Sequence, residues 1–295
     1  MPESRRDCIN PILVGGTGRS GSTVVGHLLD HHRDLVLTRP MEVRFIAGND
    51  GFADALSVAI RKPGSAKARE AAELAAERLK NRWYQRATDV GLHTSISADR
   101  LEFLSNVYLE TVDANPIEAT QRLVMSIMID VAPLGFRWID TTPANARVAD
   151  RLELIYPQSK VIGVIRDGRD VAASFVQQTF GPSDVFEALS QWERRMLKMH
   201  KAMLGSRPSR VFVVDLVDLV SGERTETLQQ LCDFLEIPVD PDMVTWFDLN
   251  VTEQGAHGGR WRTQFDSNTA ELIDQVYGEC VGRLLTAGVR IPRVP

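Results

Sequence analysis

The chain has 295 residues, of which 43% are hydrophobic and 25% are charged. A chain of this length and composition buries a large core, which excludes a disordered or fibrous protein. The formal net charge of −5 argues against a general nucleic-acid binder, while a local basic site for a small anion stays open.

The cysteines and the apolar runs indicate the cellular compartment of the protein. Cys8, Cys232 and Cys280 are odd in number and far apart in the sequence, which favours a reduced protein over a disulfide scaffold. The polar start leads straight into a strand, no apolar run approaches the length of a membrane span, and no metal-ligand spacing is present. The sequence therefore predicts a cytoplasmic protein with no membrane span and no metal.

The first predicted strand, residues 12–14, runs directly into the glycine-rich segment GGTGRSGST at residues 15–23. Its glycines permit positive φ angles, and a helix that begins near Ser22 points its unpaired N–H groups and positive dipole end at the loop. The serine and threonine hydroxyls of the segment can cap that helix or donate to phosphate oxygens. The sequence therefore predicts an anion site made by Gly18, Arg19, Ser20, Gly21, Ser22 and Thr23.

This loop differs from a nucleotide triphosphatase loop at one position. Such a loop reads G-x-x-x-x-G-K-[ST], with the lysine on the phosphates and the hydroxyl on magnesium. Gly16 and Gly21 have the required separation, but Ser22 stands in place of the lysine, and Arg19 is the cation within the loop. The loop is therefore built for an anion other than Mg-ATP.

A second strand at 35–38 is followed by a long helical insertion at about 48–135, with helices predicted over 67–86, 98–112 and 117–130. The insertion either covers one face of a sheet or forms an acceptor-binding cap. The aromatic residues of the insertion have the same two interpretations: they either line a partly apolar acceptor pocket or pack in the core. These residues are Trp83, Tyr84, Phe103 and Tyr108.

Three more strands are predicted at 136–140, 161–165 and 211–215. Strands that alternate with helices are typical of a parallel sheet with crossover helices. We therefore expect an α/β fold with a central parallel sheet and a helical insertion, in one domain that spans residues 1–295.

The fourth strand ends in a second candidate anion site. Arg166 and Arg169 follow the strand directly, and Ser174 lies in the next helix. Because a guanidinium group suits bidentate contact with phosphate, this segment could hold a second phosphate. The alternative is a solvated turn in which Arg166 pairs with Asp170.

Together the two segments resemble the sulfotransferase family that uses 3′-phosphoadenosine 5′-phosphosulfate (PAPS). The loop is similar to the family's 5′-phosphosulfate loop, and IRDGRDVAAS is similar to its 3′-phosphate motif, which maps to Arg166 and Ser174. RVFVVDLVDLV, LCDFLEIPVD and GGRWRTQF resemble later family segments, so the resemblance covers residues 11–45 and roughly 136–290. It is strongest to the tyrosylprotein and bacterial small-molecule branches, and it implies a P-loop NTPase-like three-layer fold.

The resemblance also implies roles for individual residues. PAPS would be the co-substrate, Gly259 and Arg260 would add to its site, and Arg19 would stabilise charge on the leaving phosphate. A sulfuryl group in transfer is close to neutral SO₃, so the reaction does not require the divalent ion of phosphoryl transfer. Glu42 would be the catalytic base, with Arg44 beside it in an E-x-R context. Its alternative is a surface carboxylate paired with Arg39 or Arg44.

Histidines compete with Glu42 as the base, since the family also uses histidine. They are His31 and His32 after the first helix and, as a weaker candidate, His93 in the insertion, whereas His257 in the late nucleotide-binding segment is a candidate contact to the 3′-phosphate. For His31 and His32 we favour a structural role at the carboxyl end of the helix.

Two positions depart from the family pattern. Thr141 stands where many relatives have a lysine, and Gln254-Gly255-Ala256 replaces a late basic triplet. Arg260 and Arg262 are the cations left near that triplet. Trp261 and Phe265 either pack near the nucleotide or anchor the segment in the core, and we favour packing.

The sequence thus predicts transfer of a sulfuryl group from PAPS to a hydroxyl of a small-molecule, lipid or carbohydrate acceptor. One alternative is a P-loop kinase in which Asp215 binds magnesium at the end of a strand. The other is a nucleotide-binding protein without catalysis, which Thr141 and the altered late segment would suit. Neither the acceptor nor the oligomeric state follows from the sequence.

Overall fold

The computed structural model describes residues 10–85, 91–132 and 135–294. Within these ranges five strands form one parallel sheet in the order β2-β3-β1-β4-β5. The strands are β1 (Ile12–Gly16), β2 (Leu35–Leu37), β3 (Arg137–Asp140), β4 (Lys160–Ile165) and β5 (Val211–Asp215). All five predicted strands are confirmed, with ends that shift by no more than two residues, so the predicted α/β fold with a parallel sheet is correct.

Helices connect the strands. They are α1 (Ser22–Asp30), α2 (Phe52–Arg61), α3 (Ala66–Arg78), α4 (Ala98–Thr111), α5 (Pro116–Val131), α6 (Ala149–Ile155), α7 (Gly168–Phe175), α8 (Val185–Leu204), α9 (Leu216–Val220), α10 (Arg224–Leu235), α11 (Pro241–Asn250), α12 (Glu253–Ala256), α13 (Trp261–Gln264) and α14 (Ser267–Thr286). Helix α1 begins at Ser22, which confirms the helix start predicted from the loop.

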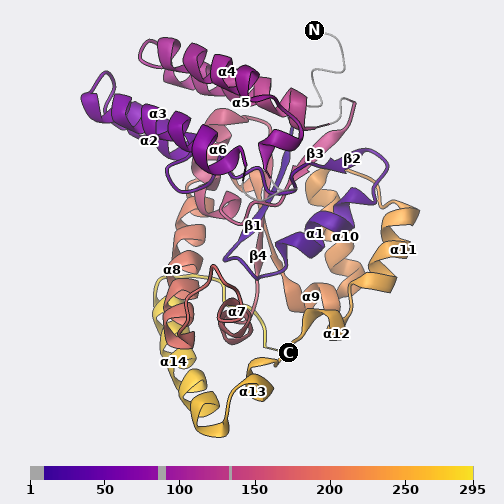
Figure 1. Cartoon of the computed structure of the whole chain (residues 1–295). Coiled ribbons are helices and arrows are strands. Elements are labelled where there is room, and N and C mark those ends of the chain that lie inside the picture. The colour runs from indigo at the N-terminus through magenta and orange to yellow at the C-terminus, as the bar shows by residue number, and fades with distance from the viewer. Residues whose placement is uncertain (1–9, 86–90, 133–134, 295) are drawn as a thin grey trace.

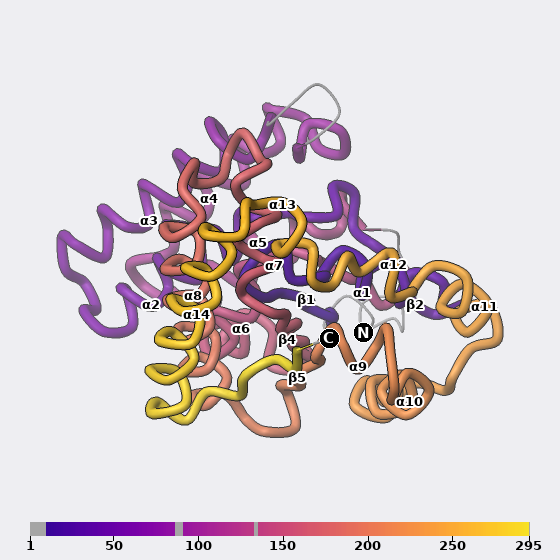
Figure 2. The backbone as a smooth tube through the Cα atoms, turned by 90° about the horizontal axis from the view of Figure 1, so that it is seen from below, coloured from indigo at the N-terminus to yellow at the C-terminus, as the bar shows by residue number. Residues whose placement is uncertain are grey.

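Both faces of the sheet are covered by helices. Successive side chains of a strand point to opposite faces, so Ile12 and Val14 pack with α1, α9, α10 and α11, whereas Leu13 packs with the helices of the other face. Figure 1 shows α1, α10 and α11 on one side of the strands and α8 and α14 on the other. Figure 2 shows the same three layers from a perpendicular direction, with β1, β4 and β5 in the middle. The predicted three-layer arrangement is confirmed.

The insertion packs as a group of helices at one end of the sheet (Figure 1), with α2–α5 side by side. The helix predicted over 67–86 is α3 followed by a π-helical turn, Leu79–Trp83, and its predicted end at Arg86 lies outside the described residues. A π turn inserts extra residues into a helix and redirects the side chains after it. Here it turns Trp83 inward against Gly48.

The strand order places a crevice at the carboxyl end of β1. The neighbours of β1 are β3 on one side and β4 on the other. The chain leaves β1 into α1 on one face of the sheet, and it leaves β3 and β4 into α6, α7 and α8 on the other face. Ligands of open parallel α/β sheets bind where the strand order reverses in this way. The glycine-rich loop, the residues after β3 and the residues after β4 all meet at this edge.

Candidate active site

The glycine-rich loop turns the chain sharply between β1 and α1. Gly18 has a φ of 81° and Gly21 a φ of 102°, which lie in the left-handed region that favours glycine. A Cβ atom on Gly18 would lie 2.9 Å from the ring of Phe175, so the loop approaches α7 closely. Gly21 is the N-cap residue of α1, and no side chain caps this helix. The N–H groups of its first turn are therefore available to a ligand.

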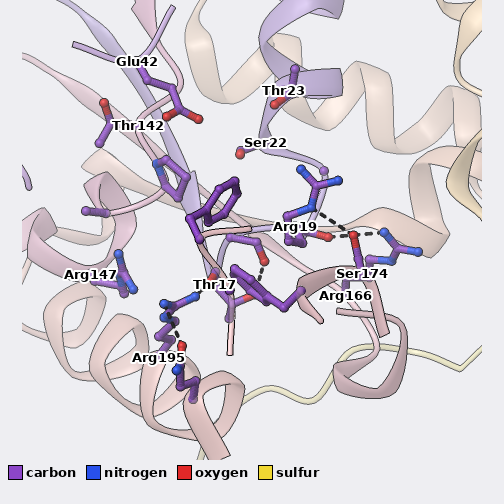
Figure 3. A pocket seen from close by; sticks show the side chains of 18 of the residues that line it. Thr17, Arg19, Ser22, Thr23, Glu42, Thr142, Arg147, Arg166, Ser174 and Arg195 are labelled. Carbon is purple, nitrogen blue, oxygen red and sulfur yellow. Dashed lines mark hydrogen bonds between the residues drawn. The ribbon is translucent and has the colours of Figure 1, made fainter. Parts of the chain in front are cut away.

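A cavity of about 560 Å³ opens in front of this loop (Figure 3). Of the residues that the sequence singled out, Gly18, Arg19, Gly21, Ser22, Thr23, Glu42, Arg166, Ser174 and Arg260 line the cavity. Ser20 and Gly259 do not. Segments that are far apart in the sequence thus meet in one place.

The hydroxyl groups of the loop do not all point the same way. Ser22 and Thr23 border the cavity, whereas Ser20 is fully buried, with its Oγ against Gly16 and without a hydrogen-bond partner among the described residues. The Ser20 hydroxyl does not line the cavity in this structure, and its contact with a phosphate stays a prediction. The expectation that these hydroxyls cap α1 is wrong, because the N-cap residue is Gly21.

Three of the residues that the sequence singled out are joined by hydrogen bonds. Arg19 Nε donates a hydrogen bond of 2.9 Å to Ser174 Oγ. Arg166 donates from Nη1 to the carbonyl oxygen of Arg19 over 3.2 Å, and from Nη2 to that of Ala256 over 2.7 Å. Figure 3 shows the three side chains gathered on one side of the cavity. Arg166 therefore connects the glycine-rich loop to the segment that contains Ala256.

The charge of Arg166 is only partly balanced. Its Nη2 lies 3.9 Å from Asp170 Oδ2, at the outer limit of an ion pair. Asp170 is 1% exposed and accepts a hydrogen bond of 3.0 Å from the N–H of Gly259 instead. Burial lowers the pKa of Arg166, and the nearby Arg260 and Arg19 lower it further against the effect of Asp170. The predicted Arg166–Asp170 pair is therefore present at this long distance, but both side chains are largely buried, so the interpretation as a solvated turn is wrong.

The late segment, residues 258–265, contributes both packing contacts and one cavity-lining side chain to the site. The Gly259 N–H is used by Asp170, so Gly259 has a structural role and does not reach the cavity. Arg260 does reach it and contacts the side-chain oxygen of Gln177. Trp261 is buried under the guanidinium group of Arg169, 4.7 Å from its ring centre, which confirms that this tryptophan packs in the core.

Glu42 enters the cavity from the segment between β2 and α2. Arg44 Nε donates to Glu42 Oε2 over 2.7 Å, and a second guanidinium nitrogen contacts the same oxygen. The pairing with Arg44 is thus present, but the carboxylate lies at a cavity wall and not on an open surface. Such a pair fixes the direction of the carboxylate.

A buried carboxylate at the end of β3 holds this segment in place. Asp140 Oδ1 accepts hydrogen bonds from the N–H of Val43 over 3.2 Å and from the N–H and hydroxyl of Thr142 over 3.0 and 2.8 Å. Asn145 donates to the other oxygen over 2.9 Å. Burial raises the pKa of Asp140 to about 6, and these hydrogen bonds oppose the rise.

Sequence reasoning missed three further arginines at the cavity, of which Arg82 lies in the π turn Leu79–Trp83. Arg147 lies in the 3₁₀ turn Asn145–Val148 after β3, and Arg195 lies on α8. Arg195 Nη1 donates to the carbonyl oxygen of Thr17 over 2.7 Å. Burial, with a smaller effect from the neighbouring Arg195, lowers the pKa of Arg147 to about 10. Arg147 could have been noticed as a cation that follows soon after a strand end. Arg195 lies in an ordinary amphipathic helix, and no sequence pattern marks it as a site residue.

The cavity is strongly cationic although the chain is acidic overall. Its lining includes seven arginines and one carboxylate, Glu42. The arginines are Arg19, Arg44, Arg82, Arg147, Arg166, Arg195 and Arg260. Charges of one sign in a concave site concentrate the field and attract small anions. The local basic site that the composition left open is therefore present.

A model of the sulfotransferase family matches residues 11–241 of the chain. The protein belongs to the sulfotransferase family. Among solved structures, the chain is similar to the sulfotransferase domain from the Synechococcus PCC 7002 olefin synthase, with a TM-score of 0.53, 16% identity, and coverage of 96% of this chain and 97% of that one. It is also similar to sulfotransferase STF9 from Mycobacterium avium, with a TM-score of 0.50, 14% identity, and coverage of 99% and 81%. A comparison with curated proteins finds no match.

At these identities the structural likeness shows the fold, and the sulfotransferase family is shown by the match over residues 11–241. The family resemblance and the P-loop-like α/β fold expected from the sequence are both confirmed. The residues that carry out the reaction must be inferred from this chain's own geometry.

The histidines of this sulfotransferase are placed mostly away from the cavity. His31 Nδ1 lies 2.8 Å from the carbonyl oxygen of His27, and its ring stacks on Trp246. His32 Nε2 lies 3.1 Å from the carbonyl oxygen of Pro238. The structural role favoured for both is confirmed. His93 is also absent from the cavity lining, whereas His257 belongs to it.

The departure at Thr141 has a packing explanation. Its hydroxyl donates to the carbonyl oxygen of Met41 over 3.0 Å, and its methyl group lies against Gly26 of α1. The residue is fully buried and does not line the cavity. The cations of the cavity come from other positions, Arg147 and Arg195 among them.

Asp215, which a kinase would use to bind magnesium, instead accepts hydrogen bonds from backbone N–H groups. Its Oδ1 accepts from the N–H of Val217 over 3.2 Å and thereby caps α9, and its Oδ2 accepts from the N–H of Arg293 over 2.6 Å. Asp215 does not line the cavity. The kinase alternative therefore loses the residue on which it depended.

Some of the remaining expectations concern cysteines, membranes and metals. Cys232 and Cys280 are free thiols, and Cys8 lies outside the described residues. In the described ranges no helix combines the length and the apolar character that crossing a bilayer requires. The same ranges contain no group of three or more side chains placed to hold a metal ion.

Proposed function

We propose that this sulfotransferase moves the sulfuryl group of PAPS to a hydroxyl of a small-molecule, lipid or carbohydrate acceptor. The observation that carries the proposal is the convergence of three parts in one cavity. These parts are the uncapped start of α1, the side chains of Arg166 and Ser174 after β4, and the Glu42 carboxylate (Figure 3). The first two bind anions, and the third accepts a proton.

The donor end of the cavity comprises residues 15–23, Arg166, Ser174 and Arg260. The N–H groups of the loop and the hydroxyls of Ser22 and Thr23 would hold the 5′-phosphosulfate, and Arg166, Ser174 and Arg260 the 3′-phosphate. These residues fit an adenosine that carries two anionic groups, because donors are grouped at two places. Arg19 lies between the two places, hydrogen-bonded to Ser174.

The acceptor end comprises Glu42, Arg44, Trp83, Arg147 and Arg195. PAPS supplies an activated sulfuryl group whose bond to the 5′-phosphate breaks as a bond to the acceptor oxygen forms. Glu42 takes the proton of the acceptor hydroxyl at a carboxylate oxygen, and Arg44 holds that carboxylate in position. Arg19 and the loop N–H groups stabilise the charge that develops on the leaving phosphate.

We also propose that residues 1–295 form one sulfotransferase domain whose insertion shapes the acceptor end. Of the insertion's aromatic residues, Trp83 lines the cavity, Tyr108 lies in the core, and Phe103 is 62% exposed away from it. The insertion therefore supplies one aromatic wall and not a fully apolar pocket. The cytoplasmic location stays a prediction from the sequence.

A thermal-shift comparison tests the proposed function. 3′-Phosphoadenosine 5′-phosphate (PAP), the product of the donor, should raise the melting temperature without magnesium, and ATP should not. A ligand at a hundred times its dissociation constant stabilises the native state by about 2.7 kcal/mol, which is readily measured. Magnesium-dependent stabilisation by ATP, with none from PAP, would overturn the proposal. PAP binding without any turnover on hydroxylated acceptors would favour a nucleotide-binding protein.

A further inference from the structure

Arg147 is a half-buried cation with no partner of opposite charge. Its side chain makes no hydrogen bond or ion pair with the residues that the structure describes, and the charge nearest to it belongs to another cation, Arg195. Arg195 itself donates to neutral oxygens, the carbonyl of Thr17 at 2.7 Å and the side chain of Gln191 at 3.0 Å. Two like charges therefore face the cavity side by side.

This arrangement is unfavourable unless an anion joins it. Burial lowers the pKa of Arg147 to about 10, so the group is still protonated at neutral pH and its charge is not relieved. Removing a charge from water is costly unless the charge is paired. The acceptor end contains one carboxylate, Glu42, and Arg44 already neutralises it.

Arg147 lies apart from the cations of the donor end, whereas Arg195 lies between Arg147 and the glycine-rich loop, where it donates to the carbonyl oxygen of Thr17. Figure 3 shows Arg147 across the cavity from Arg166 and Ser174, on the side where Thr142 and Glu42 lie, and Arg195 next to Thr17. Arg19, Arg166 and Arg260 already provide cations at the donor end. Arg147 is therefore in excess of what PAPS requires, and it lies on the side of the cavity from which an acceptor hydroxyl must approach Glu42.

We infer that the acceptor carries an anionic group, a carboxylate, phosphate or sulfate, which Arg147 binds with Arg195 beside it. The inference rests on the proposed function and narrows the class of its acceptor. A guanidinium group binds such oxyanions through two parallel hydrogen bonds, and binding in this cavity would orient the acceptor's hydroxyl toward Glu42. Trp83 would contact the uncharged part of the acceptor.

The first measurement asks whether Arg147 belongs to the donor end. PAP and PAPS are titrated calorimetrically into the wild-type protein, Arg147→Ala, Arg147→Lys and the control Arg61→Ala. Arg61 is a suitable control because it lies at the far end of α2 and contacts only a carbonyl of its own helix. We expect both nucleotides to bind all four proteins within threefold of wild type. A loss of PAPS affinity in Arg147→Ala, with PAP affinity intact, would assign Arg147 to the sulfuryl group and overturn the inference.

The second measurement probes the acceptor end with a small anion. Inorganic phosphate is titrated against the PAPS-saturated proteins at constant ionic strength, with chloride as the reference, and the melting temperature is recorded. We expect phosphate to raise the melting temperature of wild type and Arg61→Ala. Arg147→Ala should bind phosphate at least tenfold more weakly, and Arg147→Lys should keep most of the effect because it keeps the charge.

The outcomes separate the inference from the proposed function. Wild-type protein that binds neither PAP nor PAPS would contradict the proposed function itself. Wild-type protein that binds both nucleotides but shows no phosphate effect, or an equal effect in Arg147→Ala, would overturn only the inference about the acceptor. Melting temperatures measured without ligand show whether each variant is folded.

Discussion

The donor end of the cavity comes mainly from two short stretches of sequence, whereas the acceptor end comes from four. Residues 15–23 and 166–174 each follow one strand and enter one helix, so their side chains are placed by local geometry. The acceptor end needs the segment after β2, the π turn of the insertion, the turn after β3 and helix α8. A site built from adjacent residues can be recognised in a sequence, and one built from distant residues cannot.

The two ends also differ in how far their polar groups are satisfied. At the donor end Arg19 binds Ser174, and Arg166 binds two backbone carbonyls, so the anion donors are held in place by the protein. At the acceptor end Glu42 is paired, but Arg147 has no hydrogen bond or ion pair within the described residues. The donor end is thus organised in advance, while the acceptor end depends on its ligand. Four changes can break or sharpen this contrast.

The largest effect is expected for Glu42→Gln, which alters the acceptor end alone. Gln keeps the size and most of the polarity of the side chain but cannot accept the proton of the acceptor hydroxyl. General-base catalysis contributes about 10²–10⁴-fold, so turnover should fall by that factor. PAP affinity, measured by calorimetry, should stay within twofold because the donor end is untouched.

Unchanged turnover in Glu42→Gln would move the base to His257, the histidine that lines the cavity. A loss of PAP affinity would show that the two ends are not independent. Arg44→Ala serves as the companion variant, since it removes the partner of the carboxylate without removing the carboxylate.

Asp140 should make stability depend on pH, because it is the buried anchor of the Glu42 segment. Its pKa is raised from 3.8 to about 6, so the folded state holds this proton more tightly than the unfolded state. The stabilisation from that proton is complete below about pH 4 and is lost as pH rises through 6. The difference in pKa corresponds to about 3 kcal/mol.

Urea unfolding of wild type and Asp140→Asn between pH 4 and 7 measures this term, since the variant cannot titrate at that position. The wild-type free energy of unfolding, relative to the variant, should fall by about 2 kcal/mol between pH 4 and 7, which is most of the full difference. Circular dichroism first checks that the variant folds, because its new amide faces Asn145 Nδ2, which also donates to the carbonyl oxygens of Val14 and Asp140. A difference that does not change with pH would contradict the assignment.

A change confined to the donor end is Arg166→Ala. Hydrogen bonds to charged groups contribute about 1.5–3 kcal/mol, so PAP should bind roughly 10- to 100-fold more weakly. Adenosine 5′-phosphosulfate lacks the 3′-phosphate and should lose less affinity. Arg262→Ala is the matched control, because Arg262 stacks on Trp261 beside the site and does not line the cavity.

Equal losses for both nucleotides would give Arg166 a different role. Its Nη1 donates to the carbonyl oxygen of Arg19, so the substitution could disturb the loop as well as the 3′-phosphate position. The comparison of the two nucleotides therefore decides whether Arg166 binds a phosphate or positions the loop.

The same division explains what the sequence could predict. All five strands were found because each is a short apolar run, and the start of α1 was found because glycines and hydroxyl residues precede it. The burial of Ser20 was not predicted, because the residue type does not reveal which way a loop side chain points. Arg147 and Arg195 were missed because only the tertiary packing of α8 against the turn after β3 brings them together.

Asp215 gives the smallest expected effect, and it tests whether the end of β5 belongs to the site at all. Its carboxylate caps α9 and does not line the cavity. Asp215→Ala should therefore cost about 1 kcal/mol of stability, as the loss of a helix cap does, with PAP affinity and turnover within twofold of wild type. Asp184→Ala, which removes the cap of α8, is the matched control. A magnesium-dependent activity that disappears in Asp215→Ala but not in Asp184→Ala would place β5 at the reaction centre, because a helix cap alone gives no reason for the two variants to differ in activity.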